Sequence, residues 1–86
     1  MSAPFTALLI ANRGEIAIRI ARACADLEIR SVAVFAEDDD ASLHTRKADL
    51  AVPLKGRGVL AYLDMDQLIA IAAAQGCDAI HPGYGF

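Results

Sequence analysis

The chain has 86 residues, a formal net charge of −3 and 56% hydrophobic residues, which is typical of one small domain and leaves no basic surface for nucleic acid. No apolar run reaches the ~20 residues that a membrane-spanning helix needs, and the N-terminus lacks the pattern of a signal peptide. The two cysteines and two histidines show no paired spacing of the kind that zinc sites use. We therefore expect a cytoplasmic protein with reduced thiols and with no metal site, nucleic-acid partner or membrane partner.

Four short apolar segments are predicted to form strands. Residues 6–11 (TALLIA) and 31–36 (SVAVFA) are continuous apolar runs, as in strands buried on both faces. Residues 50–54 (LAVPL) are a third strand at an edge or near its end, because Pro53 cannot donate a hydrogen bond to a neighbouring strand. Residues 77–81 form a fourth strand that ends at a proline and a glycine.

The first predicted helix covers residues 15–27. Its helical periodicity places one apolar stripe toward the sheet, formed by Ile16, Ile20, Ala23 and Leu27. Two pairs of opposite charge lie four residues apart, Glu15 with Arg19 and Arg22 with Asp26, and each pair is placed to form an ion pair along the helix.

The second predicted helix covers residues 64–75. Asp64 is expected to cap its N-terminus, with Gln67 as the reciprocal member of a capping box. The connecting segments are predicted as an acidic, solvated loop at 37–40, a short helical turn at 41–47 and a glycine-containing loop at 55–58.

The alternation of strands and helices predicts an α/β fold: a small, Rossmann-like, three-layer domain with a parallel sheet of about four strands. Ligands of such sheets bind beyond the carboxyl ends of the strands. Three segments are expected to meet at that edge, residues 12–15, 37–40 and 81–86.

Residues 12–15 (NRGE) connect the first strand to the first helix. A dinucleotide site would have the pattern G-x-G-x-x-G here, but this turn has one glycine and a bulky Arg13. The residues leave open a structural turn or an anion site at the helix N-terminus. The last segment, HPGYGF, is more informative, because its glycines permit close approach by a ligand and place Tyr84 on a tight loop. The residues alone also leave open an ordinary turn in which Tyr84 and Phe86 pack locally.

Three segments resemble the opening of biotin carboxylase, the ATP-dependent component of acetyl-CoA, propionyl-CoA and pyruvate carboxylases. They are LLIANRGEIAIRIARAC (residues 8–24), the region 41–49 with its Ala-Ser-Leu-His and Ala-Asp pairs, and AIHPGYGF (residues 79–86). The family's first domain precedes an ATP-grasp module, so the resemblance identifies residues 1–86 as this pre-ATP-grasp domain. The family motif continues past Phe86, which implies that the ATP-grasp and C-terminal domains lie outside this chain.

The resemblance also implies roles for individual residues. Tyr84 and Gly85 match loop residues that line the biotin pocket in the family, and Arg22 and Asp26 match a dimer interface. No catalytic residue of the family falls within these residues. Where the family usually has glycine before the second strand, this chain has Glu28, which is expected to affect the C-terminal cap of the first helix.

The implied activity of the longer protein is that of a ligase that uses ATP, magnesium and bicarbonate to carboxylate biotin on a carrier protein. The implied partners are the rest of biotin carboxylase, the biotin carboxyl carrier domain, a carboxyltransferase and a second copy in a homodimer. The 86 residues alone are expected to be inactive and to bind no cofactor tightly. Two alternatives remain open: the first domain of another ATP-grasp ligase, such as carbamoyl-phosphate synthetase, or a non-catalytic interaction module.

Overall fold

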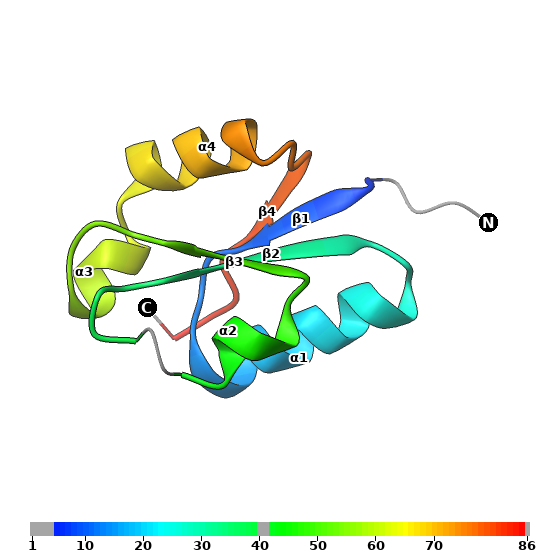
Figure 1. Cartoon of the computed structure of the whole chain (residues 1–86), viewed down its shortest axis with the longest axis horizontal. Helices are drawn as coiled ribbons and strands as arrows, with labels where there is room; N and C mark the ends of the chain where they lie inside the picture. Colours follow the sequence, from blue (N-terminus) through cyan, green and yellow to red (C-terminus); the bar gives the residue numbers. More distant parts are fainter. Residues whose placement is uncertain (1–4, 40–41, 86) are drawn as a thin grey trace.

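A computed structural model describes residues 5–39 and 42–85 of the chain (Figure 1). The described strands are β1 (Ala7–Ile10), β2 (Arg30–Phe35), β3 (Leu50–Pro53) and β4 (Ala79–His81). The described helices are α1 (Gly14–Asp26), α2 (His44–Lys47), α3 (Gly58–Tyr62) and α4 (Met65–Ala74).

The four strands form one parallel sheet in the order β3-β2-β1-β4, which confirms the predicted fold class. In the central strand, Leu9 is aligned with Val32 on one side and with Ile80 on the other. Strand β3 lies at an edge of the sheet and ends at Pro53. The missing N–H of that proline therefore interrupts no central ladder, as predicted.

The sheet has an apolar core on each face. Because successive side chains of a strand point to opposite faces, Leu8 and Ile10 pack with α1, whereas Leu9 and Ala11 pack with α3 and α4. Figure 1 shows the resulting layers, with α4 on one side of the sheet and α1 on the other. Burial of each large aliphatic side chain contributes roughly 1.5–3 kcal/mol, so the two clusters hold the layers together.

The face that α1 buries differs from the predicted one. Its buried residues are Ala17, Ile18, Ala21 and Cys24, whereas Leu27 of the predicted stripe is 64% exposed and the rest of that stripe is at most partly buried. The prediction was wrong because it ranked residues by hydrophobicity alone. The smaller Ala17, Ala21 and Cys24 pack against the sheet, so Ile16 and Ile20 lie beside that contact and are only partly buried.

The predicted ion pairs within α1 are not formed. Among the residues that the structure describes, Arg13 with Asp39 is the one pair of opposite charges within 4.0 Å. Arg22 and Asp26 are both exposed, where solvent and side-chain entropy leave such a pair little net stabilisation.

Helix α3 is missing from the prediction, which placed a loop at 55–58 and a helix only from Asp64. Its five residues include the buried Ala61 and Tyr62, and a helix this short has too few turns to show a period. The cap of α4 is partly as predicted, since Asp64 accepts a hydrogen bond from the Gln67 backbone N–H at 3.2 Å. The reciprocal half is absent, because the Asp64 N–H already bonds to Ala61 and the Gln67 side chain instead binds the backbone of Lys55.

Helices α1 and α4 end in the same way. After α1, the N–H groups of Glu28 and Ile29 donate to Ala25 and Cys24, and two equivalent bonds close α4. This pair of backbone hydrogen bonds needs a residue with positive φ just after the helix. At the end of α4 that residue is Gly76, with φ +71°, but at the end of α1 it is Glu28, with φ +58°. Glu28 thus affects the cap, as expected from the sequence, because a residue with a side chain is strained at this φ.

Replacing Glu28 by glycine is expected to raise the free energy of unfolding by about 0.5–1 kcal/mol. Relief of the ~1–2 kcal/mol strain of a left-handed residue exceeds the ~0.4–1 kcal/mol of added chain entropy. The matched substitution Gly76→Ala is expected to lower the free energy of unfolding by about 1 kcal/mol. Urea denaturation of the three proteins measures both changes, and a loss of stability in Glu28→Gly would contradict this account of the cap.

Candidate functional site

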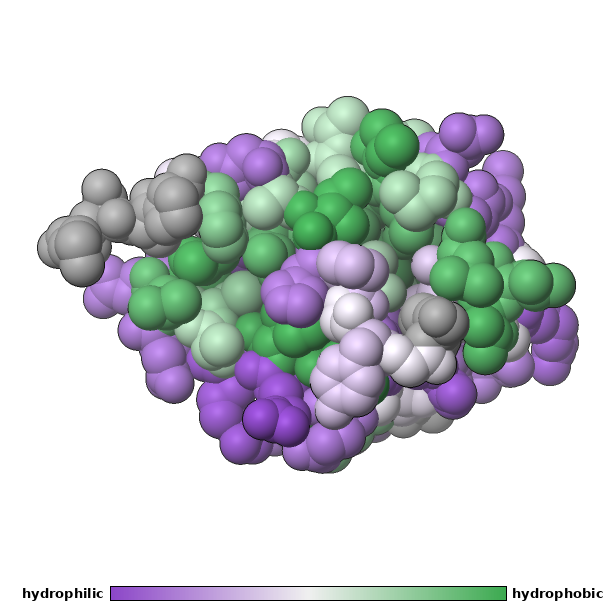
Figure 2. Space-filling view, turned by 180° about the vertical axis from the view of Figure 1, so that it is seen from behind, coloured by the Kyte–Doolittle hydropathy of each residue, from purple (hydrophilic) through white to green (hydrophobic). Residues whose placement is uncertain are grey.

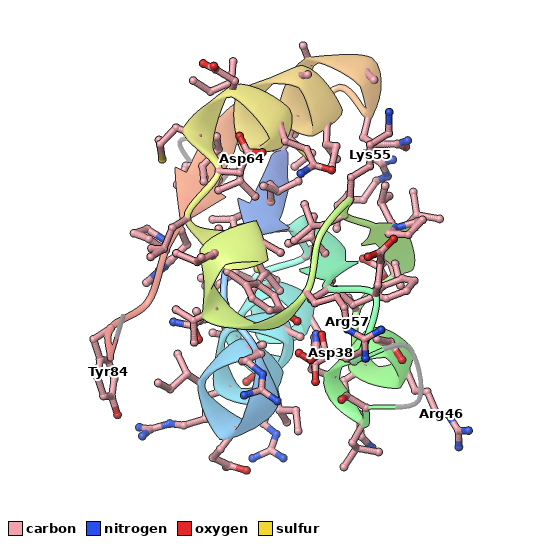
Figure 3. All side chains as sticks on the ribbon, turned by 90° about the vertical axis from the view of Figure 1, so that its left-hand side faces the viewer. Asp38, Arg46, Lys55, Arg57, Asp64 and Tyr84 are labelled. Carbon is pink, nitrogen blue, oxygen red and sulfur yellow. The ribbon has the colours of Figure 1, made fainter. Side chains whose placement is uncertain are left out.

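The carboxyl end of β4 leads into an exposed loop. Tyr84 is 70% exposed, and in Figure 3 its side chain points away from the body of the domain. Gly83 and Gly85 both have positive φ, +65° and +94°. The Gly83 N–H also donates to Nδ1 of His81 at 3.0 Å, which tightens the turn. Tyr84 is therefore presented to solvent rather than packed locally, and Phe86 lies outside the described residues.

Asn12, directly after β1, holds this loop. Its side chain is 2% exposed, and its Nδ2 donates to the carbonyl oxygens of Pro82 at 2.7 Å and Tyr84 at 3.0 Å. A Cβ on Gly83 would lie only 2.6 Å from that Nδ2 and 2.7 Å from Cγ2 of Ile16. Position 83 therefore requires glycine for space as well as for its φ angle. The sequence interpretation missed the role of Asn12. A polar residue just after a buried apolar strand could have indicated that its side chain bonds to a neighbouring segment.

Arg13 joins the same turn to the end of β2. Its guanidinium donates two hydrogen bonds to the carboxylate of Asp39, at 2.9 and 2.8 Å. The hydroxyl of Tyr62 donates a third at 2.7 Å, and the Ser42 hydroxyl donates a longer one at 3.3 Å. The residues 12–15, 37–39 and 81–85 thus meet at one edge, as predicted for the described part of those segments.

Asp39 is buried, with 7% of its surface exposed, so the predicted solvated loop at 37–40 is wrong at this position; Asp40 lies outside the described residues. Burial alone would raise the pKa of Asp39, but the hydrogen bonds from Arg13 and Tyr62 outweigh it and hold the pKa below its ordinary value. Burial also raises the pKa of Tyr62, whose hydroxyl therefore stays protonated as a donor. The sequence interpretation also missed the bond from Tyr62 to Asp39, because Tyr62 belongs to a short helix that the sequence pattern did not indicate.

His44 of α2 is also buried, with 1% of its surface exposed. Its Nε2 is 3.1 Å from the carbonyl oxygen of Val34, which makes Nε2–H the donor. Its Nδ1 has no hydrogen-bond partner within the described ranges 5–39 and 42–85. Burial lowers the pKa of His44, so the ring is neutral near pH 7.

An apolar hollow of about 410 Å³ lies between the loop and helices α3 and α4. Its lining combines a residue that follows β1 with residues of β4, the two helices and the loop: Ala11, Tyr62, Leu63, Met65, Leu68, Ile80, Pro82, Gly83 and Tyr84. Figure 2 shows hydrophobic surface over the α3 and α4 side of the molecule. A hollow with an apolar lining and a few polar groups at its rim is the usual form of a small-molecule site.

The other site predictions lie elsewhere. Arg22 and Asp26 are on the exposed surface of α1 and do not line the hollow. Across the described residues, no three His, Cys, Asp or Glu side chains are grouped to hold a metal ion, and no helix is long and apolar enough to cross a membrane. The cysteines Cys24 and Cys77 are free thiols.

Comparison with known proteins decides the family. The family described as "Biotin carboxylase, N-terminal domain" matches residues 4–86. The chain belongs to this family. The match confirms the resemblance and, among the alternatives, favours biotin carboxylase over other ATP-grasp ligases.

The curated relatives of this chain are much longer proteins. Mitochondrial pyruvate carboxylase of Rattus norvegicus is 52% identical over 86 residues, covering 96% of this chain and 7% of that protein. Biotin carboxylase 1 of Bacillus subtilis is 50% identical over 80 residues, covering 92% of this chain and 18% of that protein. The chain therefore spans between 7% and 18% of the length of these two relatives.

Solved structures of biotin carboxylase share the fold of this domain. The biotin carboxylase domain of a single-chain bacterial carboxylase has a TM-score of 0.91 and 54% identity, covering 94% of this chain and 19% of that one. The biotin carboxylase domain of a thermophilic 2-oxoglutarate carboxylase, bound to ADP, has the same TM-score at 41% identity, covering 95% and 18%.

Acid is expected to destabilise the domain in two ranges of pH. The pKa of His44 is lowered in the folded state, so the unfolded chain binds more protons and stability falls as pH drops below the ordinary value of 6.5. The pKa of Asp39 is also lowered, so a second loss begins as pH falls below 3.8. Substituting His44→Gln should reduce the dependence of the melting temperature on pH between pH 7 and about 5. This range lies around and just below the ordinary histidine pKa.

The exposed His81→Gln substitution is the control for loss of a histidine from the surface. Melting curves recorded at each pH by circular dichroism provide the measurement. A slope that is unchanged in His44→Gln would contradict the assignment to the buried ring.

Proposed function

We propose that this chain is the N-terminal domain of an ATP-dependent biotin carboxylase, and that its sheet edge forms one wall of the site for carrier-bound biotin. The observation that carries the proposal is the loop 82–85, where the exposed Tyr84 and Gly83 border an apolar hollow and Gly85 follows them. Membership in the biotin carboxylase family supports the same assignment.

The residues of the loop fit biotin chemically. Biotin has an apolar sulfur-containing ring with an aliphatic chain, fused to a polar ureido ring, and Tyr84 offers an aromatic face with a hydroxyl at its end. Gly85 has no side chain, so a ligand is able to approach the backbone. Tyr84 and Gly85 would hold biotin from one side only. Good small-molecule sites bury roughly 70–90% of the ligand, so we assign the remaining walls to the polypeptide beyond these 86 residues.

We assign ATP, magnesium and the reacting groups to that same outer polypeptide. The described residues offer no metal-binding group, and the turn 12–15 lacks a phosphate-binding glycine pattern. When bound, ATP and magnesium would activate bicarbonate, so that its carboxyl group is transferred to the ureido nitrogen of biotin. The residues of this chain contribute by holding the loop and by keeping water from one side of the site.

The proposed assembly follows the architecture of the family. The partners would be the rest of biotin carboxylase, the carrier domain, a carboxyltransferase and a second copy of the enzyme. Arg22 and Asp26 are exposed on α1, and a two-fold axis would let each arginine meet the aspartate of the partner. Free thiols at both cysteines are compatible with the proposed cytoplasmic location.

In a complete biotin carboxylase that carries this chain, Tyr84→Ala is expected to raise KM for free biotin about tenfold, equivalent to ~1.4 kcal/mol. Loss of the aromatic face weakens contact with biotin but leaves the chemistry of ATP untouched, so KM for ATP should stay constant. Leu43→Ala, which removes an exposed side chain at the start of α2 that does not line the hollow, is the matched control. Steady-state kinetics that show the same KM for biotin in all three proteins would remove Tyr84 from the site.

Arg22→Glu is expected to weaken the enzyme dimer by up to about thirtyfold, because the substitution removes two exposed pairs that contribute ~0–1 kcal/mol each. Combining it with Asp26→Arg should restore association. Arg46→Glu, on the exposed surface of α2, is the control for a change in net charge. Sedimentation velocity measures the dimer constant, and an Arg22→Glu protein with unchanged association would place the interface elsewhere.

A further inference from the structure

Asn12 has every hydrogen-bonding group of its side chain engaged. Its Oδ1 accepts from the Arg13 N–H at 2.8 Å, while its Nδ2 donates to the carbonyl oxygens of Pro82 and Tyr84. The residue is buried, so none of these bonds is readily replaced by water. A primary amide, with two donors and one acceptor, is the side chain that satisfies this set.

The two acceptors of the Asn12 amide lie on either side of Gly83. Nδ2 therefore fixes the backbone both before and at Tyr84, and Gly83 packs against the amide with no room for a Cβ. The backbone N–H of Gly83 is held separately by His81. One further hydrogen bond fixes the start of the loop, from the Ala11 N–H to the carbonyl oxygen of His81 at 2.9 Å.

The amide is itself held in place from the other side of the sheet edge. Arg13 follows Asn12 in sequence and binds the buried carboxylate of Asp39 with two hydrogen bonds. Asp39 in turn accepts from Tyr62 of α3, which also lines the apolar hollow. The position of the loop is thus fixed relative to the opposite wall of the hollow.

We propose that Asn12 is a positioning residue for biotin: its buried amide sets the backbone of the loop that presents Tyr84 to the ligand. The proposal rests on the proposed function, because it gives Asn12 a role in the same site. Asn12 has no contact with the ligand in this proposal, and it acts only through the loop.

The test is Asn12→Asp in a complete biotin carboxylase that carries this chain. The substitution keeps the size of the side chain but places an oxygen where two carbonyl oxygens need a donor. We expect KM for free biotin to rise about tenfold or more, while KM for ATP and kcat at saturating biotin stay within about twofold. Ser31→Ala is the matched control, since it removes a buried side-chain partner of Asp49 at the opposite end of the same sheet, and KM for biotin should not change.

The outcomes separate the two proposals when Tyr84→Ala is measured in parallel. A raised KM for biotin in Tyr84→Ala, with an unchanged one in folded Asn12→Asp, overturns the role of Asn12 and leaves the site standing. An unchanged KM in Tyr84→Ala overturns the site itself. If Asn12→Asp does not fold, Gly83→Ala perturbs the same contact from the loop, and an unchanged KM for biotin there overturns the proposal. Equal losses for biotin and ATP indicate general distortion and also overturn it.

Discussion

The carboxylate of Asp39 is the group on which the arrangement of the sheet edge depends. A buried carboxylate is costly unless it is fully paired, and here Arg13 and Tyr62 provide the pairing. Satisfying that one charge brings together the turn after β1, the end of β2 and helix α3. The charge is thus the reason why three segments from opposite faces of the sheet converge at one point, and why the hollow beside them has a fixed wall.

The parallel sheet supplies the framework for this convergence. Since all four strands run in the same direction, their carboxyl ends lie along one edge, and the residues that follow them are neighbours regardless of their separation in sequence. Asn12 and Tyr84 are 72 positions apart, yet they share a hydrogen bond. The same edge therefore carries both the polar network around Asp39 and the exposed apolar hollow.

The fold was predictable because buried parallel strands give continuous apolar runs, and TALLIA and SVAVFA are such runs. The tyrosine loop was predictable because glycines punctuate it. The buried face of α1 was not, because Ala17 and Ala21 are selected for their small size, which a hydrophobicity pattern does not register. Asp39 looked like its acidic neighbours, since its distinguishing feature is a partner 26 residues away. The contact of Tyr62 with Asp39 was not predictable, because α3 is shorter than two turns of helix and shows no period.

The contact between Asn12 and Gly83 also restricts how the two positions are able to diverge. The volume that a Cβ at position 83 would need is already occupied by the Asn12 amide and by Cγ2 of Ile16, so a larger residue at 83 requires smaller ones at both 12 and 16. The φ of +65° narrows the choice further, to glycine or, with less ease, asparagine or aspartate. We therefore expect positions 12, 16 and 83 to covary across distant relatives, with any side chain at 83 accompanied by smaller ones at 12 and 16.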